Sequence, residues 1–123
     1  MKSISKSENR PSFERDANSI AGCPSIIVVG VRSNPAGLNC RYCGYGNCEN
    51  LKKSGGECDY NSIDLGIAVS SAVSIASEFH IDNRMMHSIG RACMDLGLFS
   101  KSIKQALGVP LSVTGKSPFF DRK

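Results

Sequence analysis

Apolar positions follow two different patterns along this chain. Residues 25–31 (SIIVVGV) form a continuous β-branched run between Pro24 and the turn residues 33–35. A short run of this kind predicts a strand that is buried on both faces. After Tyr60 the apolar spacing becomes helical. The two patterns together predict a domain that contains both strands and helices.

The helical region begins with a segment that is small and apolar on all sides, over residues 61–79. Such a segment predicts a central helix that packs closely on several sides. Asn61 suits its N-cap, and Asp64 suits the positive end of the helix dipole.

Two further helices and a strand are expected after the central helix. An amphipathic helix capped by Asp82 or Asn83 runs to about Leu96, with apolar side chains three or four residues apart. A short helix over 100–108 and a last strand over 109–113 complete the chain. The predicted fold class is α+β: a small sheet packed on the central helix and on a second, amphipathic helix.

Residues 33–60 show no apolar periodicity apart from one helical turn expected over 48–53. This segment holds four of the six cysteines and five of the twelve glycines. A loop of this length inside a compact domain usually serves a function or binds a metal.

Length and composition indicate one soluble domain. The chain has 123 residues, of which 41% are hydrophobic and 21% charged. Residues 1–22 are expected to form a polar, partly flexible lead-in, and residues 23–123 the single domain. A net charge of +4 is too small to indicate nucleic-acid binding.

Nothing in the sequence indicates export or a membrane span. The first twenty residues lack an apolar signal region, and the longest uncharged helical stretch, 65–77, is too short to cross a bilayer. We therefore expect a cytoplasmic protein without membrane contact, in which the cysteines are reduced.

Four cysteines within nineteen residues carry the candidate chemistry. Gly44 and Gly46 allow the chain between them to curl, so that the four sulfurs can converge. The spacing is Cys-x2-Cys-x4-Cys-x9-Cys, and the candidate ligands are Cys40, Cys43, Cys48 and Cys58.

This spacing favours an iron–sulfur cluster of the [4Fe–4S] type. Three cysteines crowd one irregular loop, which suits a cube in which each iron binds one thiolate. Structural zinc sites more often pair two short knuckles across a longer spacer, so a zinc-stabilised interaction module is an alternative. Two disulfides or four free thiols are the remaining alternatives.

The other reactive residue types have simpler interpretations. Cys93 falls on the apolar face of its helix, and Cys23 has no partner at metal-binding spacing. His80 and His87 stand beside no recognisable nucleophile, so no catalytic residue is assigned and no hydrolase is expected. Basic residues flank the cysteines and could dock an acidic redox partner protein; a solvated surface is the alternative. They are Arg41, Lys52 and Lys53.

Several blocks of the sequence resemble one known family. They include FERDA, IIVVGV, LNCRYCGYGNC, DNRMMHSIG and GVPLSVTGKSPFFDR. From about Phe13 to Arg122 the chain resembles uncharacterised prokaryotic proteins that contain a ferredoxin domain. The resemblance implies a [4Fe–4S] cluster on the four cysteines of the loop and does not imply a reaction. One-electron transfer is the function that we expect from the cluster itself.

A second resemblance concerns the fold. The strand 26–31, the sequence DLGIA at 64–68 and the sequence LGVP at 107–110 are similar to segments of flavin-dependent nitroreductases. This likeness implies a homodimer that binds FMN. The alternative function is therefore a subunit or fragment of an FMN-dependent reductase that receives electrons from the cluster.

Overall fold

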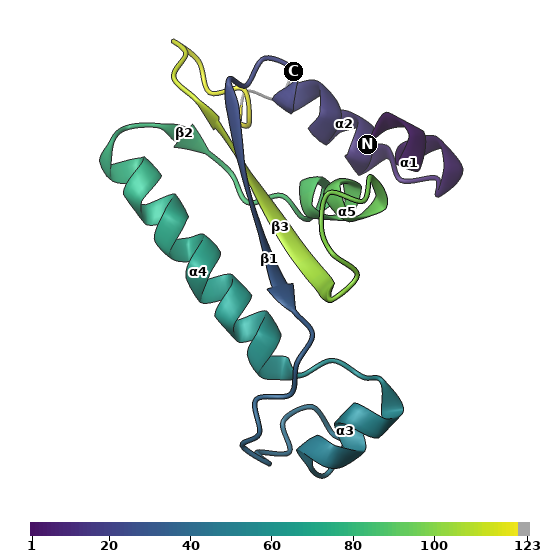
Figure 1. Ribbon diagram of the computed structural model, residues 1–123. Helices are drawn as coiled ribbons and strands as arrows, with labels where there is room; N and C mark the ends of the chain where they lie inside the picture. The colour runs from purple at the N-terminus through teal and green to yellow at the C-terminus, as the bar shows by residue number, and fades with distance from the viewer. Residues whose placement is uncertain (121–123) are drawn as a thin grey trace.

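The fold is α+β, as predicted, with a three-stranded antiparallel sheet between two sets of helices (Figure 1). A computed structural model describes residues 1–120. Helix α4 lies on one face of the sheet, and α2 and α5 lie on the other. The elements in chain order are α1 (Lys2–Ser7), α2 (Pro11–Ile20), β1 (Ser25–Arg32), α3 (Cys48–Ser54), α4 (Asp59–Glu78), β2 (Asp82–Asn83), α5 (His87–Asp95) and β3 (Ile103–Ser112).

Strand β3 is the centre of the sheet, whose order is β1-β3-β2. The short helix predicted over 100–108 is therefore wrong, and the predicted last strand is longer than expected. β3 pairs with β1 along nearly its whole length, from Ile103 opposite Arg32 to Leu111 opposite Ser25. This pairing outweighs the local helical preference of residues 104–107.

Pro110 explains why β2 is only two residues long. β2 pairs with β3 at Ser112 and Leu111, and a separate bridge joins Met86 to Gly108. Pro110 lies between these two contacts and has no N–H with which to continue the ladder. The edge of the sheet is therefore interrupted at this proline.

Alternate residues of the strands supply two apolar layers. On one face Leu65 and Val69 of α4 pack with Val109 of β3. On the other face Val28 of β1 packs against Met86, Ile89 and Phe119. The sheet is thus covered on both faces, as the period of two in a strand requires.

Two elements are less buried than their sequences predict. β1 forms the expected strand, but it lies at the edge of the sheet, and Ile26 and Ile27 are exposed. α4 forms the expected helix, but it packs on the sheet with one side only, so its predicted packing on several sides is wrong. It also begins two residues before Asn61, which lies inside the helix instead of capping it.

The polar N-terminal segment is folded, in contrast to the lead-in expected over residues 1–22. It forms α1 and α2, and α2 buries Phe13 completely. Buried Asp16 accepts a hydrogen bond of 2.6 Å from Ser88 of α5. α2 is therefore part of the core.

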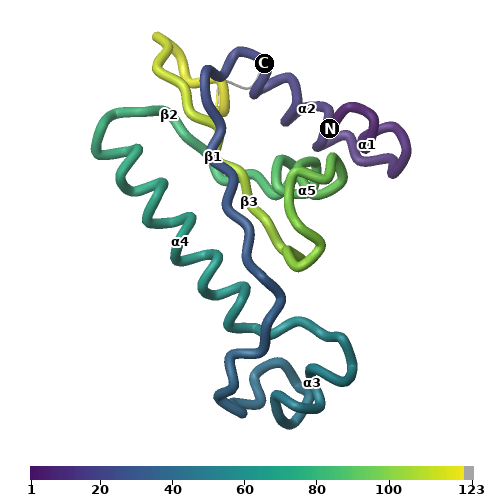
Figure 2. Tube along the Cα trace, in the orientation of Figure 1, coloured from purple at the N-terminus to yellow at the C-terminus, as the bar shows by residue number. Residues whose placement is uncertain are grey.

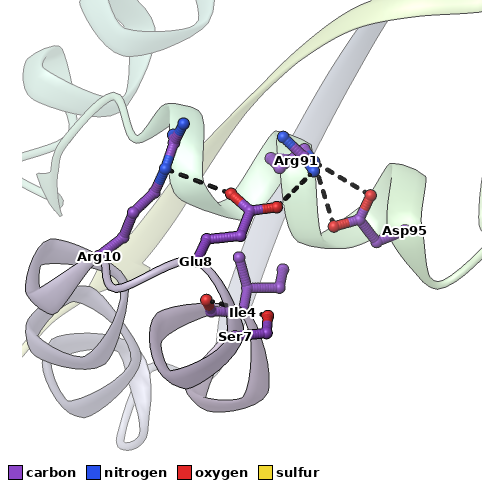
Figure 3. Close-up of polar contacts among 6 residues, drawn as sticks. All are labelled: Ile4, Ser7, Glu8, Arg10, Arg91 and Asp95. Atoms are coloured by element: carbon purple, nitrogen blue, oxygen red, sulfur yellow. Dashed lines mark hydrogen bonds and ion pairs between the residues drawn. The ribbon is translucent and has the colours of Figure 1, made fainter.

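A chain of ion pairs joins the N-terminal helices to α5 (Figure 3). The Glu8 carboxylate lies between Arg10 and Arg91, at 3.2 and 2.8 Å. Arg91 also pairs with Asp95 of its own helix, at 3.0 Å. Such exposed pairs contribute little stability individually, and Phe13 and Asp16 make the stronger attachment.

The second amphipathic helix is present but shorter than predicted. α5 begins at His87, because Asp82 and Asn83 form strand β2 instead of a cap. Over residues 1–120, no helix combines the length and the apolar character needed to cross a bilayer.

Candidate metal centre

Residues 33–60 form a separate lobe at one end of the molecule, called here the cysteine lobe (Figure 2). It connects β1 to α4 and contains α3. The helical turn expected at 48–53 is confirmed as α3, which the side chain of Asn47 caps by accepting a 2.8 Å hydrogen bond from the N–H of Asn50. Apart from α3 and the first two residues of α4, the lobe has no regular structure.

The cysteine lobe is fixed to the rest of the molecule where it begins and ends. The Asn61 side-chain amide faces the backbone of Asn34. In the amide orientation that satisfies both groups, its nitrogen donates a 3.0 Å hydrogen bond to the Asn34 carbonyl and its oxygen accepts a 3.2 Å hydrogen bond from the Asn34 N–H. Ser33 donates a 2.8 Å hydrogen bond to Glu57. The two ends of the lobe are therefore held side by side.

Aromatic side chains support the lobe between its ends. The rings of Tyr42 and Tyr60 stack, with centroids 6.0 Å apart and planes 12° apart. The ring of Tyr45 lies against Gly56, where an added Cβ would approach the ring to 2.6 Å. These contacts hold the cysteine-bearing loop against the start of α4.

One small hollow brings the four cysteines of the loop together. The open volume inside this hollow is about 10 Å³, close to that of one water-sized sphere, so the residues of its wall lie close together. Its wall includes buried Leu51 and all four candidate sulfur ligands: Cys40, Cys43, Cys48 and Cys58.

The backbone of the lobe follows the curl that its glycines predict. Gly44 and Gly46 both have left-handed φ values, of 79° and 77°. Asn39 and Arg41 also have positive φ, at 49° and 65°. Four such residues within eight positions turn the chain around the hollow.

Asn39 makes two hydrogen bonds with Cys48. Its backbone N–H points to the Cys48 sulfur at 3.4 Å, and its side-chain oxygen accepts from the Cys48 N–H at 2.9 Å. An N–H group directed at sulfur stabilises negative charge there. Asn39 was not predicted from the sequence; an asparagine immediately before a cysteine, in a glycine-bearing loop, is the signal that could have identified it.

The two remaining cysteines lie outside the lobe. Cys23 and Cys93 both pack against the apolar layer formed by Met86, Ile89 and Phe119. Burial raises the pKa of both thiols above the ordinary value. A protonated thiol is a poor metal ligand, so the surroundings of both cysteines favour a structural role.

Over residues 1–120, no three His, Cys, Asp or Glu side chains are gathered as they would be around a single metal ion. The donor set of the hollow, four thiols with one N–H directed at sulfur, nevertheless suits a group that binds each thiolate at a separate metal atom.

The fold and this thiol-lined hollow define a small α+β protein with a cysteine-rich lobe. A family described as "Uncharacterized protein containing a ferredoxin domain" matches residues 54–122, which is more than half of the chain, and the chain belongs to that family. The description of the family names a ferredoxin domain and no activity. Of the four lobe cysteines, the matched range contains only Cys58.

A relative covers the rest of the cysteine lobe. An uncharacterised protein of Archaeoglobus fulgidus is 40% identical over 119 residues. The alignment covers 89% of this chain, an extent that includes residues 40–58, and 64% of the relative. The chain thus spans less than two thirds of the relative's length. No solved structure matches the chain.

Proposed function

We propose that the protein binds a [4Fe–4S] cluster in the cysteine lobe and transfers single electrons to a redox partner protein. The observation that carries the proposal is the hollow whose wall includes four cysteines from two segments of the chain. Membership of a ferredoxin-domain family supports the same class of function. When bound, the cluster would supply reversible one-electron chemistry.

The four cysteines would have different degrees of freedom as ligands. Cys40, Cys43 and Cys48 belong to one curled loop and are partly exposed. Cys58 is buried and directly precedes α4, so that its position is fixed by the first turn of a long helix. We therefore expect Cys58 to be the most rigid of the four.

Charged and polar groups of the lobe would set the reduction potential. The N–H of Asn39 at the Cys48 sulfur stabilises negative charge, and Arg41 contributes a positive charge to the wall of the hollow. Both effects favour the reduced, more negative state. Lys53 is already paired with Glu49 at 2.7 Å, which reduces its contribution.

The exposed rim of the lobe would be the contact surface for the partner. Tyr42 is 68% exposed and Leu38 is 60% exposed, and both belong to the cysteine-bearing segment. Exposed aromatic and apolar side chains close to a redox centre suit a weak, transient interface.

Chemical analysis of one anaerobic preparation tests the proposal. We expect brown protein with close to four irons and four sulfides per chain, whose visible absorption bleaches on reduction with dithionite. Stoichiometric zinc without sulfide, from cells supplied with iron and assembly factors, would contradict both the cluster and electron transfer. A yellow chromophore released by acid would instead support the FMN-dependent alternative.

A further inference from the structure

The outer side of α4 carries an uncovered apolar row. Within residues 1–120, no other element lies on the side of α4 that faces away from the sheet (Figure 1). Ile67 is 61% exposed, Ile75 is 56% exposed and Phe79 is 72% exposed. Ile63 and Ser71 are also exposed and share the same spacing of four residues. The five residues form a ridge along the helix, called here the α4 stripe: Ile63, Ile67, Ser71, Ile75 and Phe79.

The composition around the stripe is that of a buried interface. No charged residue occurs from Leu65 to Ser77. A surface helix normally presents charged and polar side chains to water. The cores of protein interfaces, in contrast, are depleted of charge and rich in apolar contact.

The surface area of the chain leaves room for such an interface. A compact monomer of 13.2 kDa exposes about 6,400 Å², whereas this chain exposes 7910 Å². The difference, about 1,500 Å², exceeds the ~800 Å² that each partner buries in an interface of standard size.

The order of residues in the α4 stripe is symmetric about Ser71. An isoleucine lies four positions away on each side, and a large apolar residue lies eight positions away on each side. In a two-fold interface each residue meets the equivalent surface of its own copy. Two antiparallel copies crossing at Ser71 therefore place Ile67 against the partner's Ile75.

The chemistry of Ser71 suits the crossing point. Its side chain is small, which permits close approach of two helices whose rows of four-spaced residues interdigitate. Its hydroxyl donates a 3.0 Å hydrogen bond to the carbonyl of Ile67 in the same helix. No polar group is therefore left without a partner when this position is buried.

We infer that the α4 stripe is the interface of a homodimer whose two-fold axis passes beside Ser71. The antiparallel arrangement sets opposite ends of the two helix dipoles side by side. It also directs the two cysteine lobes away from each other, since each lobe precedes the first turn of its own α4.

The mass of the purified full chain in solution, measured by light scattering without oxygen, tests the dimer. We expect wild type at twice 13.2 kDa at high micromolar concentration. Ser71→Glu should give the mass of a single chain, because two like charges would face each other across the axis. Leu96→Glu, which places the same charge at an exposed apolar residue outside the stripe, should remain a dimer.

A mixture of two variants with opposite charges at position 71 tests the position of the two-fold axis. Ser71→Lys alone should also be a single chain, whereas an equimolar mixture of Ser71→Glu and Ser71→Lys should recover the mass of two chains. Recovery shows that both variants are folded, because unfolded chains would not reassemble specifically.

Three results would overturn the inference. They are a single-chain mass for wild type, a dimer that Ser71→Glu leaves intact, and a charge mixture that stays at the mass of one chain. None of these masses depends on iron or sulfide, so the dimer and the proposed cluster can fail separately.

Discussion

At the scale of single residues, the six cysteines separate by what surrounds them. Four line a hollow in the cysteine lobe, and two pack among apolar side chains. Burial raises the pKa of Cys23 and Cys93, which keeps these thiols protonated near neutral pH. The spacing in the sequence predicts the same division, because metal ligands cluster along the chain and core cysteines do not.

Alanine substitutions should therefore divide the cysteines into two groups. Replacement of Cys40, Cys43 or Cys48 should abolish or severely deplete the cluster, because each change removes the ligand of one iron. Cys58→Ala should leave a labile or three-iron cluster, because the three remaining cysteines lie close together in the sequence and still hold one iron each. Cys93→Ala should keep full iron content and lower the free energy of unfolding by about 1–2 kcal/mol. Iron content and visible spectra of anaerobic preparations provide the measurement, with Cys23→Ala as a second control. Iron loss in Cys93→Ala with an intact fold would refute the assignment of ligands.

Gly46 offers a test of the loop conformation. Its φ of 77° is strained for any residue with a Cβ, although the nearest atom to an added Cβ is Asn50 Nδ2 at 3.9 Å. Gly46→Ala should therefore act through backbone strain of about 1–2 kcal/mol. That energy corresponds to release of iron to a chelator about 5–30 times faster than in wild type. Gly22→Ala, at an open position with ordinary φ, should release iron at the wild-type rate. Equal rates for Gly46→Ala and wild type would show that the curl does not control cluster retention.

At the scale of elements, the contact between α5 and β3 depends on a glycine. An added Cβ at Gly90 would overlap the carbonyl group of Ala106. This close approach lets the helix lie directly against the central strand. A residue with a Cβ does not fit at position 90, so the packing of α5 on β3 depends on glycine there.

Gly90→Ala should consequently destabilise the whole domain. We expect a loss of about 3 kcal/mol, at the upper end of the range for overpacked cores, because the obstacle is backbone and cannot rotate away. Urea denaturation followed by circular dichroism measures the change. Gly22→Ala is the matched control and should lie within ~0.5 kcal/mol of wild type. A Gly90→Ala protein as stable as wild type would mean that α5 can move away from β3 at little cost.

The sequence predicts some elements well and others poorly, for physical reasons. β1, α3 and α4 follow from local signals: a β-branched run, an asparagine cap and a long helical apolar pattern. β3 does not, because residues 104–107 (KQAL) favour a helix locally and only pairing with β1 makes them a strand. The burial of each side chain is harder still to predict, because the exposed side of α4 depends on which other elements of the fold pack against the helix.

The same distinction applies to the candidate site. The four cysteines and the two positive-φ glycines of the loop are evident from the sequence. The pairing of Asn61 with Asn34 is not, because it joins residues that are 27 positions apart and resembles a helix cap when read locally. Contacts between segments distant in the sequence therefore cannot be predicted from local patterns.

At the scale of the whole molecule, the protein consists of a layered core and the cysteine lobe. α3 makes at most marginal contact with the other helices and strands of residues 1–120. Only Leu51 and Cys58 are buried apolar residues of the lobe. The lobe thus has little apolar surface to stabilise it without a bound group.

Removal of the cluster should unfold the lobe and leave the core intact. A metal group that binds only to the folded state stabilises that state by its binding free energy. In apo protein we expect amide hydrogens of residues 38–57 to exchange much faster than in holo protein. Those of β3 should be unchanged, and they serve as the internal control. Mass spectrometry of peptides after hydrogen exchange makes the comparison, and protection of α3 in apo protein would contradict it.

The pairing of Asn34 with Asn61 has a consequence for the entropy of the chain. It holds the two ends of residues 35–60 together, so to the core this segment is a closed loop of 26 residues. Closure entropy grows with the logarithm of loop length, and replacing the 26 residues by a four-residue linker should stabilise the core by about 1.7 kcal/mol, measurable by urea denaturation. The cysteine lobe then resembles an insert carried by a core that could fold without it.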